Sequence, residues 1–343
     1  MTVFFFSNFE IGGAQKIAIS LINKLHKKDK NFNKIISVNK YGKLKKNINR
    51  QIKIYDFNKK RLIHCVIEYL KYIDKNNVKK IFCVQPHNAI LCYFLNIFLK
   101  RKIKIIARET NSYKENKFRT FSFKERIFIL LKKFVYKKLH LVVCPSKGIQ
   151  KEIDGNKIFI SNFVDIKNLM KIKSREKNYI LSIGRLVKQK RYQDLIEAFN
   201  LIHNEISEKL IIIGEGPEKK RLKNLINKLK LNKRIKIIPF KSYLTYLSNC
   251  KVYIQTSAWE GMPNILIEAL VLKKKIVSTN CLHGPKEILR NGKYGYLCNV
   301  GDVKEISKAI KIKLNEKKIN IPDNFINNFS IKIAANKYYK ILK

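Results

Sequence analysis

The chain has 343 residues, which is more than one ordinary hydrophobic core holds and favours two domains. Apolar residues make up 45% of it, so the chain can bury substantial cores and need not be disordered. The formal net charge of +48 favours anionic partners such as nucleic acid, acidic phospholipid or phosphorylated substrates. The basic residues are spread over both halves rather than concentrated on one element, and a lysine-rich proteome explains them equally well.

Seven cysteines are scattered along the chain without a Cys-x-x-Cys pair. This odd number and spacing argue against a disulfide framework and a zinc site, and they fit a reducing cytoplasm. The longest uncharged run, residues 81–99, is interrupted by Gln85, Pro86, His87 and Asn88. It therefore predicts a strand, a turn and an apolar helix rather than a membrane span. The N-terminus lacks the basic start of a signal peptide.

Short apolar runs rich in Val, Ile and Phe alternate with longer helical patterns. Buried strands separated by helices predict parallel sheets covered on both faces, and two series of strands predict two doubly wound α/β domains. The first series is 2–6, 34–38, 80–84, 104–107 and 141–144, with a helix at 13–25 after its first strand. The second series is 179–183, 210–213, 235–238, 252–255 and 275–278.

The most informative stretch is residues 257–270, directly after the predicted strand 252–255. Ligands of open α/β sheets bind at the carboxyl ends of the strands. This stretch places Glu260 in a loop and Glu268 in the helix that follows. Exposed N–H groups at a helix start can hold phosphate oxygens, and carboxylates can hold sugar hydroxyls. A nucleotide sugar is a ligand with both parts.

Other predicted strand ends carry weaker signals. The paired glycines Gly12 and Gly13 follow the first strand and would let a ligand approach the backbone closely. Arg185 and Lys190 follow the strand 179–183 and could converge on one anion, although a chain this basic scatters many such pairs.

The order of these motifs resembles glycosyltransferase family 4, whose members are retaining transferases of the GT-B architecture. The likeness covers nearly the whole chain, and its most specific part is Glu-Gly-Met-Pro-Asn-Ile-Leu-Ile-Glu at 260–268. The resemblance implies an α/β fold with two Rossmann-like doubly wound domains that face each other across a cleft. The implied domains are an acceptor-side domain at 1–165, a nucleotide-sugar domain at 166–324, and a C-terminal helix at 325–343 that crosses back to the first domain.

The resemblance also implies a role for each motif residue. Glu260 would contact the donor sugar, while Arg185 and Lys190 would stabilise the leaving diphosphate. Glu268 would bind the ribose hydroxyls. The other implied donor-binding residues are Gly12 and Gly13, Gly261, and Met262, Asn264 and Ile265 through their N–H groups. Fixed cations and N–H groups stabilise charge where it develops, so no metal or other cofactor is expected.

One segment departs from the family pattern. Many relatives place a histidine in the loop after the strand equivalent to 104–107, where this chain has Arg-Glu-Thr-Asn at 108–111. Glu109 and the nearby His87 are therefore candidates for the acceptor or donor-sugar side, and either residue could instead cap a helix or satisfy a loop. Residues 118–138 mix apolar and basic side chains. This pattern is typical of a helix lying on an anionic membrane, and equally of a domain helix with a lysine-rich outer face.

We therefore predict a hexosyl- or N-acetylhexosaminyltransferase. It would move a sugar from a UDP-sugar to a glycan or lipid-linked glycan acceptor in bacterial lipopolysaccharide, capsule or lipid-linked oligosaccharide synthesis. It would be cytoplasmic, peripheral at the anionic inner face of the cell membrane, and without a specific nucleic-acid partner. One alternative is an epimerase or hydrolase of the same fold, which forms product without an acceptor. The other is a non-enzymatic binder of nucleic acid or membrane surfaces, whose nucleic-acid affinity would fall steeply with salt.

Overall fold

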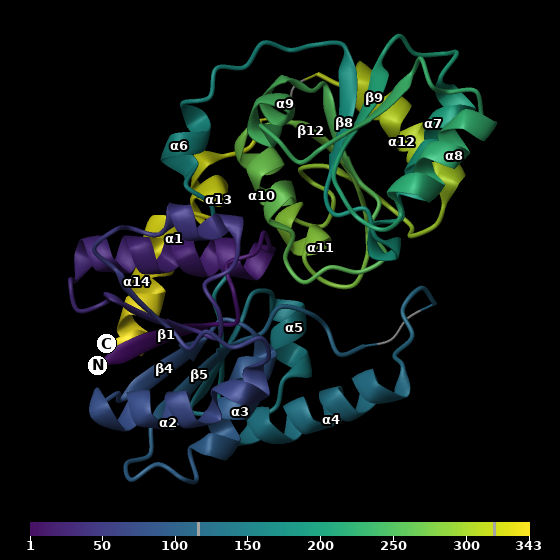
Figure 1. Cartoon of the computed structure of the whole chain (residues 1–343). Helices are drawn as coiled ribbons and strands as arrows, with labels where there is room; N and C mark the ends of the chain where they lie inside the picture. The colour runs from purple at the N-terminus through teal and green to yellow at the C-terminus, as the bar shows by residue number, and fades with distance from the viewer. Residues whose placement is uncertain (115–116, 318–319) are drawn as a thin grey trace. The chain divides into compact units, whose positions relative to one another are not determined.

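The chain forms two compact units in the computed structural model, which describes residues 1–114, 117–317 and 320–343 (Figure 1). Unit 1 comprises Met1–Phe163 together with Ser330–Lys343, and unit 2 comprises Val164–Phe329. Unit 2 thus continues to Phe329, past the boundary at 324 expected from the sequence. Only the last helix of the C-terminal segment joins the N-terminal residues.

Unit 1 is built on a parallel sheet of seven strands among its described residues, in the order β3-β2-β1-β4-β5-β6-β7. The strands are β1 (Thr2–Phe6), β2 (Lys34–Ser37), β3 (Lys53–Asp56), β4 (Lys80–Cys83), β5 (Lys104–Arg108), β6 (Leu141–Cys144) and β7 (Lys157–Phe159). The inner strands are runs of Phe, Ile and Val, which suit a pleated surface buried on both faces.

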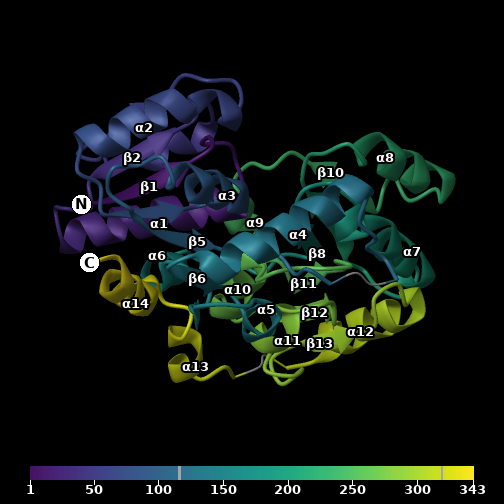
Figure 2. The same cartoon turned by 90° about the horizontal axis from the view of Figure 1, so that it is seen from below.

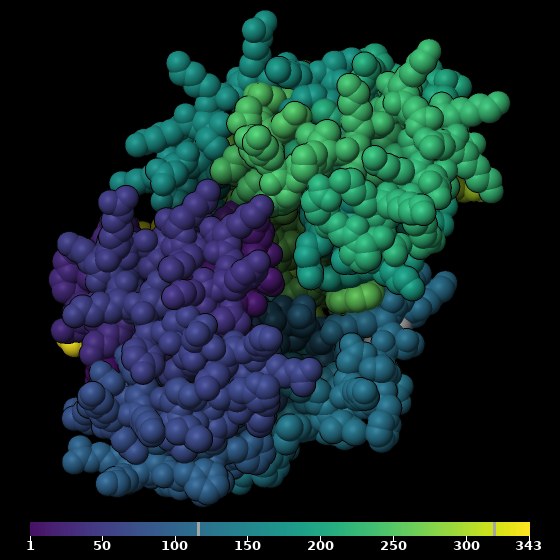
Figure 3. Space-filling model, viewed as in Figure 1, coloured from purple at the N-terminus to yellow at the C-terminus, as the bar shows by residue number. Residues whose placement is uncertain are grey.

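Helices cover both faces of this sheet. The helices of unit 1 are α1 (Gly13–Lys28), α2 (Val66–Lys75), α3 (Pro86–Leu95), α4 (Phe123–Lys138), α5 (Lys147–Glu152) and α14 (Ile331–Leu342). α1 and α14 pack together on one face, while α2 to α5 cover the other. α3 and α4 are neighbours in both ribbon views (Figures 1 and 2), and α4 lies at the surface of the unit (Figure 3).

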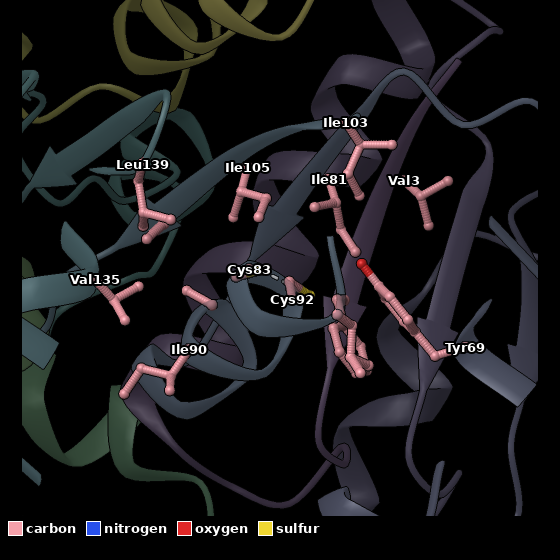
Figure 4. Packing of buried hydrophobic residues seen from close by; sticks show 14 of the residues in the cluster. Val3, Tyr69, Ile81, Cys83, Ile90, Cys92, Ile103, Ile105, Val135 and Leu139 are labelled. Carbon is pink, nitrogen blue, oxygen red and sulfur yellow. Dashed lines mark hydrogen bonds between the residues drawn. The ribbon is translucent and has the colours of Figure 1, made fainter. Parts of the chain in front are cut away.

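The core under α2, α3 and α4 is closely packed (Figure 4). Tyr69 stacks on Phe5 with ring centroids 5.9 Å apart. Cys83 and Cys92 lie side by side with sulfurs 3.8 Å apart, and all seven cysteines are free and buried. Burial raises the pKa of the Cys83 thiol well above its ordinary value. The Cys83 thiol therefore packs as a small apolar group rather than as a nucleophile.

Unit 2 has a parallel sheet of six strands among its described residues, in the order β10-β9-β8-β11-β12-β13. The strands are β8 (Tyr179–Ile183), β9 (Lys209–Ile213), β10 (Ile235–Ile238), β11 (Val252–Gln255), β12 (Lys275–Thr279) and β13 (Tyr296–Cys298). α6 (Ile166–Met170), α9 (Tyr243–Asn249), α10 (Asn264–Val271), α11 (Pro285–Ile288) and α13 (Asp323–Asn327) pack on one face. α7 (Tyr192–Ile202), α8 (Lys219–Lys228) and α12 (Val303–Asn315) pack on the other.

The predicted fold class is confirmed, since each unit is a Rossmann-like, doubly wound parallel sheet. In each sheet the first strand lies between its successor and a later strand: β1 between β2 and β4, and β8 between β9 and β11. The chain therefore reverses its direction of winding beside β1 and beside β8, and such switch points are where open α/β sheets bind ligands. No helix in the described part of the chain is long and apolar enough to cross a membrane.

Candidate functional site

The candidate site of unit 2 lies at its switch point, where the loops after β8 and β11 meet. The loop after β8 begins at Gly184, and the loop after β11 holds Glu260. Several bonds join the two loops. Among them, Gln189 Nε2 donates to the Trp259 carbonyl (2.7 Å), the Ala258 N–H donates to the Gln189 carbonyl (2.8 Å), and Thr256 Oγ1 donates to the Lys190 carbonyl (3.0 Å). The loops therefore form one structural piece.

An ion pair occupies the centre of this junction. Lys190 Nζ donates to Glu260 Oε1, and the Ser257 hydroxyl donates to the same oxygen at 2.6 Å. The side chains of Lys190 and Glu260 are 19% and 10% exposed. The free-energy cost of partly burying each charge is offset by attraction to the other charge. Either charge without its partner would bear the full desolvation penalty. The sequence proposed separate roles for Lys190 and Glu260; the structure brings them into contact.

The second glutamate lies in the helix that follows. Glu268 is buried in α10, and its Oε1 accepts a hydrogen bond from the Tyr243 hydroxyl at 3.0 Å. Tyr243 stacks on Phe240, with ring centroids 4.9 Å apart and planes inclined by 30°. Phe240 follows β10 and is 37% exposed, so an aromatic surface lies next to the Glu268 carboxylate. Tyr243 and Phe240 were not identified from the sequence.

The remaining predicted residues of unit 2 gather at the same edge. Arg185 is exposed directly after β8. Gly261 and Met262 are buried between Glu260 and α10, while Asn264 and Ile265 are half-buried in the first turn of that helix.

The sequence Gly-Glu-Gly-Pro at 214–217, directly after β9, has a structural function. Gly216 has a φ of +154°, and a Cβ there would lie 2.4 Å from the Leu186 carbonyl oxygen. The Leu186 N–H in turn donates to the Glu215 carbonyl at 2.8 Å. Only glycine allows this close approach, which supports the loop that carries Arg185.

The predicted residues of unit 1 lie at the carboxyl edge of its own sheet. Gly12 precedes α1 as its N-cap and Gly13 is the first residue of the helix. A Cβ on Gly13 would meet no atom within 4 Å, so the chain's own packing does not require glycine there.

His87 belongs to a polar cluster at the switch point of unit 1. Its Nε2 lies 2.6 Å from Ser7 Oγ, and Ser7 Oγ also donates to Asn88 Oδ1 at 2.9 Å. Asn88 Nδ2 donates to the Phe5 carbonyl at 3.2 Å. The cluster ties the loop after β1 to the start of α3 and leaves the His87 side chain exposed. Ser7 carries no local sequence signal, because its partners lie eighty residues along the chain.

Glu109 has a different environment from His87. Its side chain is 1% exposed and pairs with Lys132 of α4 at 2.9 Å. Oε1 accepts from the N–H groups of Thr110 (2.7 Å) and Asn111 (3.0 Å), and Oε2 accepts from the Tyr113 hydroxyl (3.1 Å). These bonds fix the loop after β5, so a ligand contact through this carboxylate would require their displacement.

The chain resembles known glycosyltransferases in sequence and in fold. Residues 165–330, nearly all of unit 2, match the family model of glycosyl transferases group 1. Over 198 residues the chain is 32% identical to an uncharacterized glycosyltransferase of Methanocaldococcus jannaschii, covering 52% of this chain and 47% of that protein. It is 29% identical over 220 residues to a Campylobacter jejuni enzyme named N-acetylgalactosamine-N,N'-diacetylbacillosaminyl-diphospho-undecaprenol 4-alpha-N-acetylgalactosaminyltransferase, covering 60% and 58% of the two chains. The chain thus spans about half the length of these relatives.

Among solved structures, the Anabaena protein HepE in complex with UDP superposes with a TM-score of 0.79 at 17% identity, over 100% of this chain and 99% of that one. This likeness shows the fold, which is that of GT-B glycosyltransferases. The match to glycosyl transferases group 1 thus falls almost entirely on unit 2. No group of three or more His, Cys, Asp or Glu side chains within residues 1–114, 117–317 and 320–343 could hold a metal ion.

Proposed function

We propose that the chain is a retaining glycosyltransferase of family 4 that transfers a sugar from a UDP-sugar to a lipid-linked glycan. The observation that carries the proposal is the cluster at the switch point of unit 2, where the Lys190–Glu260 pair lies between the loops after β8 and β11. The group 1 match covers this unit, and UDP is the ligand named for the Anabaena neighbour.

Each residue has a proposed task in this reaction. When the bond between the sugar and the diphosphate breaks, negative charge develops on the diphosphate, and Arg185 and Lys190 stabilise it. Arg185 binds two phosphate oxygens at once, whereas Lys190 supplies a point charge. The diphosphate becomes negatively charged when the bond is cleaved, and in this proposal Arg185 and Lys190 hold it. The proposed reaction therefore uses no metal.

The two carboxylates hold the neutral parts of the donor. Glu260 accepts from hydroxyls of the sugar while its charge is balanced by Lys190. Glu268, held by Tyr243, accepts from the ribose hydroxyls, and Phe240 offers a face on which the uracil ring stacks.

The acceptor proposal comes from the Campylobacter relative, whose name describes a diphospho-undecaprenol-linked sugar. By analogy we propose a polyprenyl-diphosphate-linked glycan of bacterial surface-glycan synthesis as the acceptor here, and peripheral contact with the anionic inner face of the cell membrane.

The test is UDP release from a panel of UDP-sugars, with and without lipid-linked acceptor extracted from bacterial membranes. We expect acceptor-dependent release and a product that retains the anomeric configuration. Arg185→Ala and Glu268→Ala should each lower kcat/KM about a hundredfold, the usual cost of one preorganised contact. Arg221→Ala is the matched control, since Arg221 pairs with Glu218 on the exposed face of unit 2.

Two outcomes would contradict the proposal. Wild-type rates in both variants would remove the assigned site. Full turnover of the donor without any acceptor would replace the transferase with a hydrolase or epimerase.

A further inference from the structure

Unit 1 exposes large apolar side chains along α4. Phe123 is 78% exposed, Leu130 66%, Phe134 52% and Ile127 49%. These four positions follow the spacing i, i+4, i+7 and i+11, so they share one side of the helix. Single exposed apolar residues are ordinary, but a contiguous row of this kind marks an interaction surface.

The C-terminal end of α3 and the turn after it extend this surface. Phe98 is 73% exposed, Ile97 64% and Phe94 39%. α3 is packed against α4, and Tyr93 meets the ring of Phe134 edge-on at 6.3 Å. We call these exposed apolar residues of α3, of the turn after it and of α4 the α3–α4 face. The two helices lie side by side in Figures 1 and 2.

A basic pocket of about 360 Å³ opens beside this face, at the amino edge of the sheet. Its polar lining includes Lys102, Lys104, Lys138 and His140, and no acidic residue lines it. Lys102 Nζ donates to the carbonyls of Asn96 and Ile97 at 2.9 Å, which places its charge at the end of α3. Burial, together with the charges of Lys104 and Lys80, lowers the pKa of His140, in keeping with an electropositive pocket.

More basic residues flank the α3–α4 face. The exposed ones are Lys100 and Arg101 after α3, and Lys124, Arg126, Lys133 and Lys137 on α4. Acidic residues near the two helices are engaged: Glu125 in the capping box with Ser122, Asp154 with Lys137 at 3.5 Å, and the buried Glu109 with Lys132 at 2.9 Å. The face is therefore apolar in its middle and positive around it.

We propose that the α3–α4 face docks on an anionic phospholipid bilayer. Phe98, Phe123 and Leu130 enter the boundary between headgroups and acyl chains, and a lipid phosphate occupies the pocket beside Lys104 and Lys138. Apolar side chains surrounded by lysines match such a membrane in both shape and charge. This inference gives a location to the membrane contact of the proposed function and rests on it for the biological role of that contact.

The charge distribution favours this occupant over the others. A second copy of the chain would bring a like-charged surface against the same lysines and repel it. Nucleic acid would satisfy the lysines but leave the row of Phe and Leu side chains in water.

The experiment is flotation of the full chain with vesicles. One set contains phosphatidylcholine alone, and the other about one-third phosphatidylglycerol. We expect binding to the second set only, with affinity that falls as salt rises, because the attraction to lipid charge is screened.

Paired variants assign the binding to the α3–α4 face and its pocket. The double variant Phe123→Ser/Leu130→Ser should lower partitioning about tenfold or more, through lost apolar burial. Lys104→Gln/Lys138→Gln should lower it roughly 25-fold, since each basic residue near an anionic surface contributes about a factor of five. Ile63→Ser/Ile67→Ser, two residues each 64% exposed elsewhere on unit 1, is the apolar control. Lys230→Gln/Lys236→Gln, at exposed positions of unit 2, is the charge control.

Several results would overturn the inference. They are failure of the wild type to bind anionic vesicles, equal losses in variants and controls, or a dimer without vesicles that Phe123→Ser/Leu130→Ser dissociates. RNA that competes with the vesicles and binds the Phe123→Ser/Leu130→Ser variant as well as the wild type would also count against the inference. UDP release, measured in parallel, keeps the two proposals separate. A wild type that releases UDP normally but does not bind anionic vesicles removes only the docking surface, and a wild type that binds the vesicles but releases no UDP removes only the transferase.

Discussion

Two Lys–Glu ion pairs lie at opposite edges of the sheet in unit 2. Lys190 and Glu260 meet at the carboxyl edge, whereas Lys251 and Glu208 meet at 2.5 Å at the amino edge, before β11 and β9. In both pairs the glutamate is nearly buried and the lysine is more exposed. The two pairs are chemically alike, so their surroundings decide what each can do.

The surroundings differ because a parallel α/β sheet orients its helices. Helices enter the carboxyl edge by their N-termini, which present N–H groups, and reach the amino edge by their C-termini, which present carbonyls. At the amino edge Arg234 donates to the carbonyls of His203 (2.6 Å), Ile206 (2.7 Å) and Glu208 (2.9 Å). At the carboxyl edge Arg185 is exposed. The fold thus engages this amino-edge cation with its own backbone, whereas Arg185 remains accessible to an anionic ligand.

The strongest test of the difference between the two ion pairs is to replace the lysine of each pair by alanine. Lys190→Ala should lower kcat about 10²- to 10³-fold, because it deletes a preorganised charge at the leaving group. Lys251→Ala should change kcat less than about threefold, since no substrate contact is lost. Steady-state UDP release below the melting temperature measures both variants. Comparable losses would mean that the two pairs are not functionally distinct.

Removal of charge from each glutamate sharpens the comparison. Glu260→Gln should lower kcat/KM about a hundredfold, because the substitution weakens sugar contacts and frees Lys190 from its partner. Glu208→Gln should keep kcat/KM but lower the free energy of unfolding by about 1–3 kcal/mol, because Lys251 loses its counter-charge. Urea unfolding together with kinetics separates the two effects. Loss of stability without loss of activity at Glu260 would assign a purely structural role to that pair.

Arg234→Ala tests the amino edge alone. Three carbonyls lose a charged donor, and we expect the free energy of unfolding to fall by about 2 kcal/mol while KM for the donor stays unchanged. Thermal melts with and without UDP measure this. A weakened shift of the melting temperature by UDP would place this arginine in the ligand site and contradict the division of the edges.

The smallest effect is expected for the hydroxyl beside the Lys190–Glu260 pair. Ser257→Ala removes one donor to Glu260 Oε1 and should lower kcat/KM about tenfold, which corresponds to about 1.4 kcal/mol. Ser207→Ala is the control, because its hydroxyl bonds Asn178 near the amino edge. A Ser257 variant with normal kinetics would show that Lys190 alone orients Glu260.

The sequence alone determined every inner strand of the two sheets and the edge strand β10. It also determined the strand, turn and helix within 81–99 and the placement of the motifs at strand ends. Inner strands are recognisable because burial on both faces demands unbroken runs such as those of β1 and β11. In a parallel sheet all strands share one carboxyl edge, so motifs after β8 and β11 had to come together. The three strands that the pattern missed, β3, β7 and β13, are short edge strands, and all their residues except Cys298 are exposed or half-buried.

Only the tertiary structure decided which side chains meet. The Lys190–Glu260 bond joins residues 70 positions apart, and Lys132 of α4 neutralises Glu109 inside unit 1. Tyr243 reaches Glu268 across 25 positions. A local sequence pattern predicts whether a residue is buried, because burial follows the period of the strand or helix to which the residue belongs. It does not report a partner on another element, since that depends on how the whole chain packs.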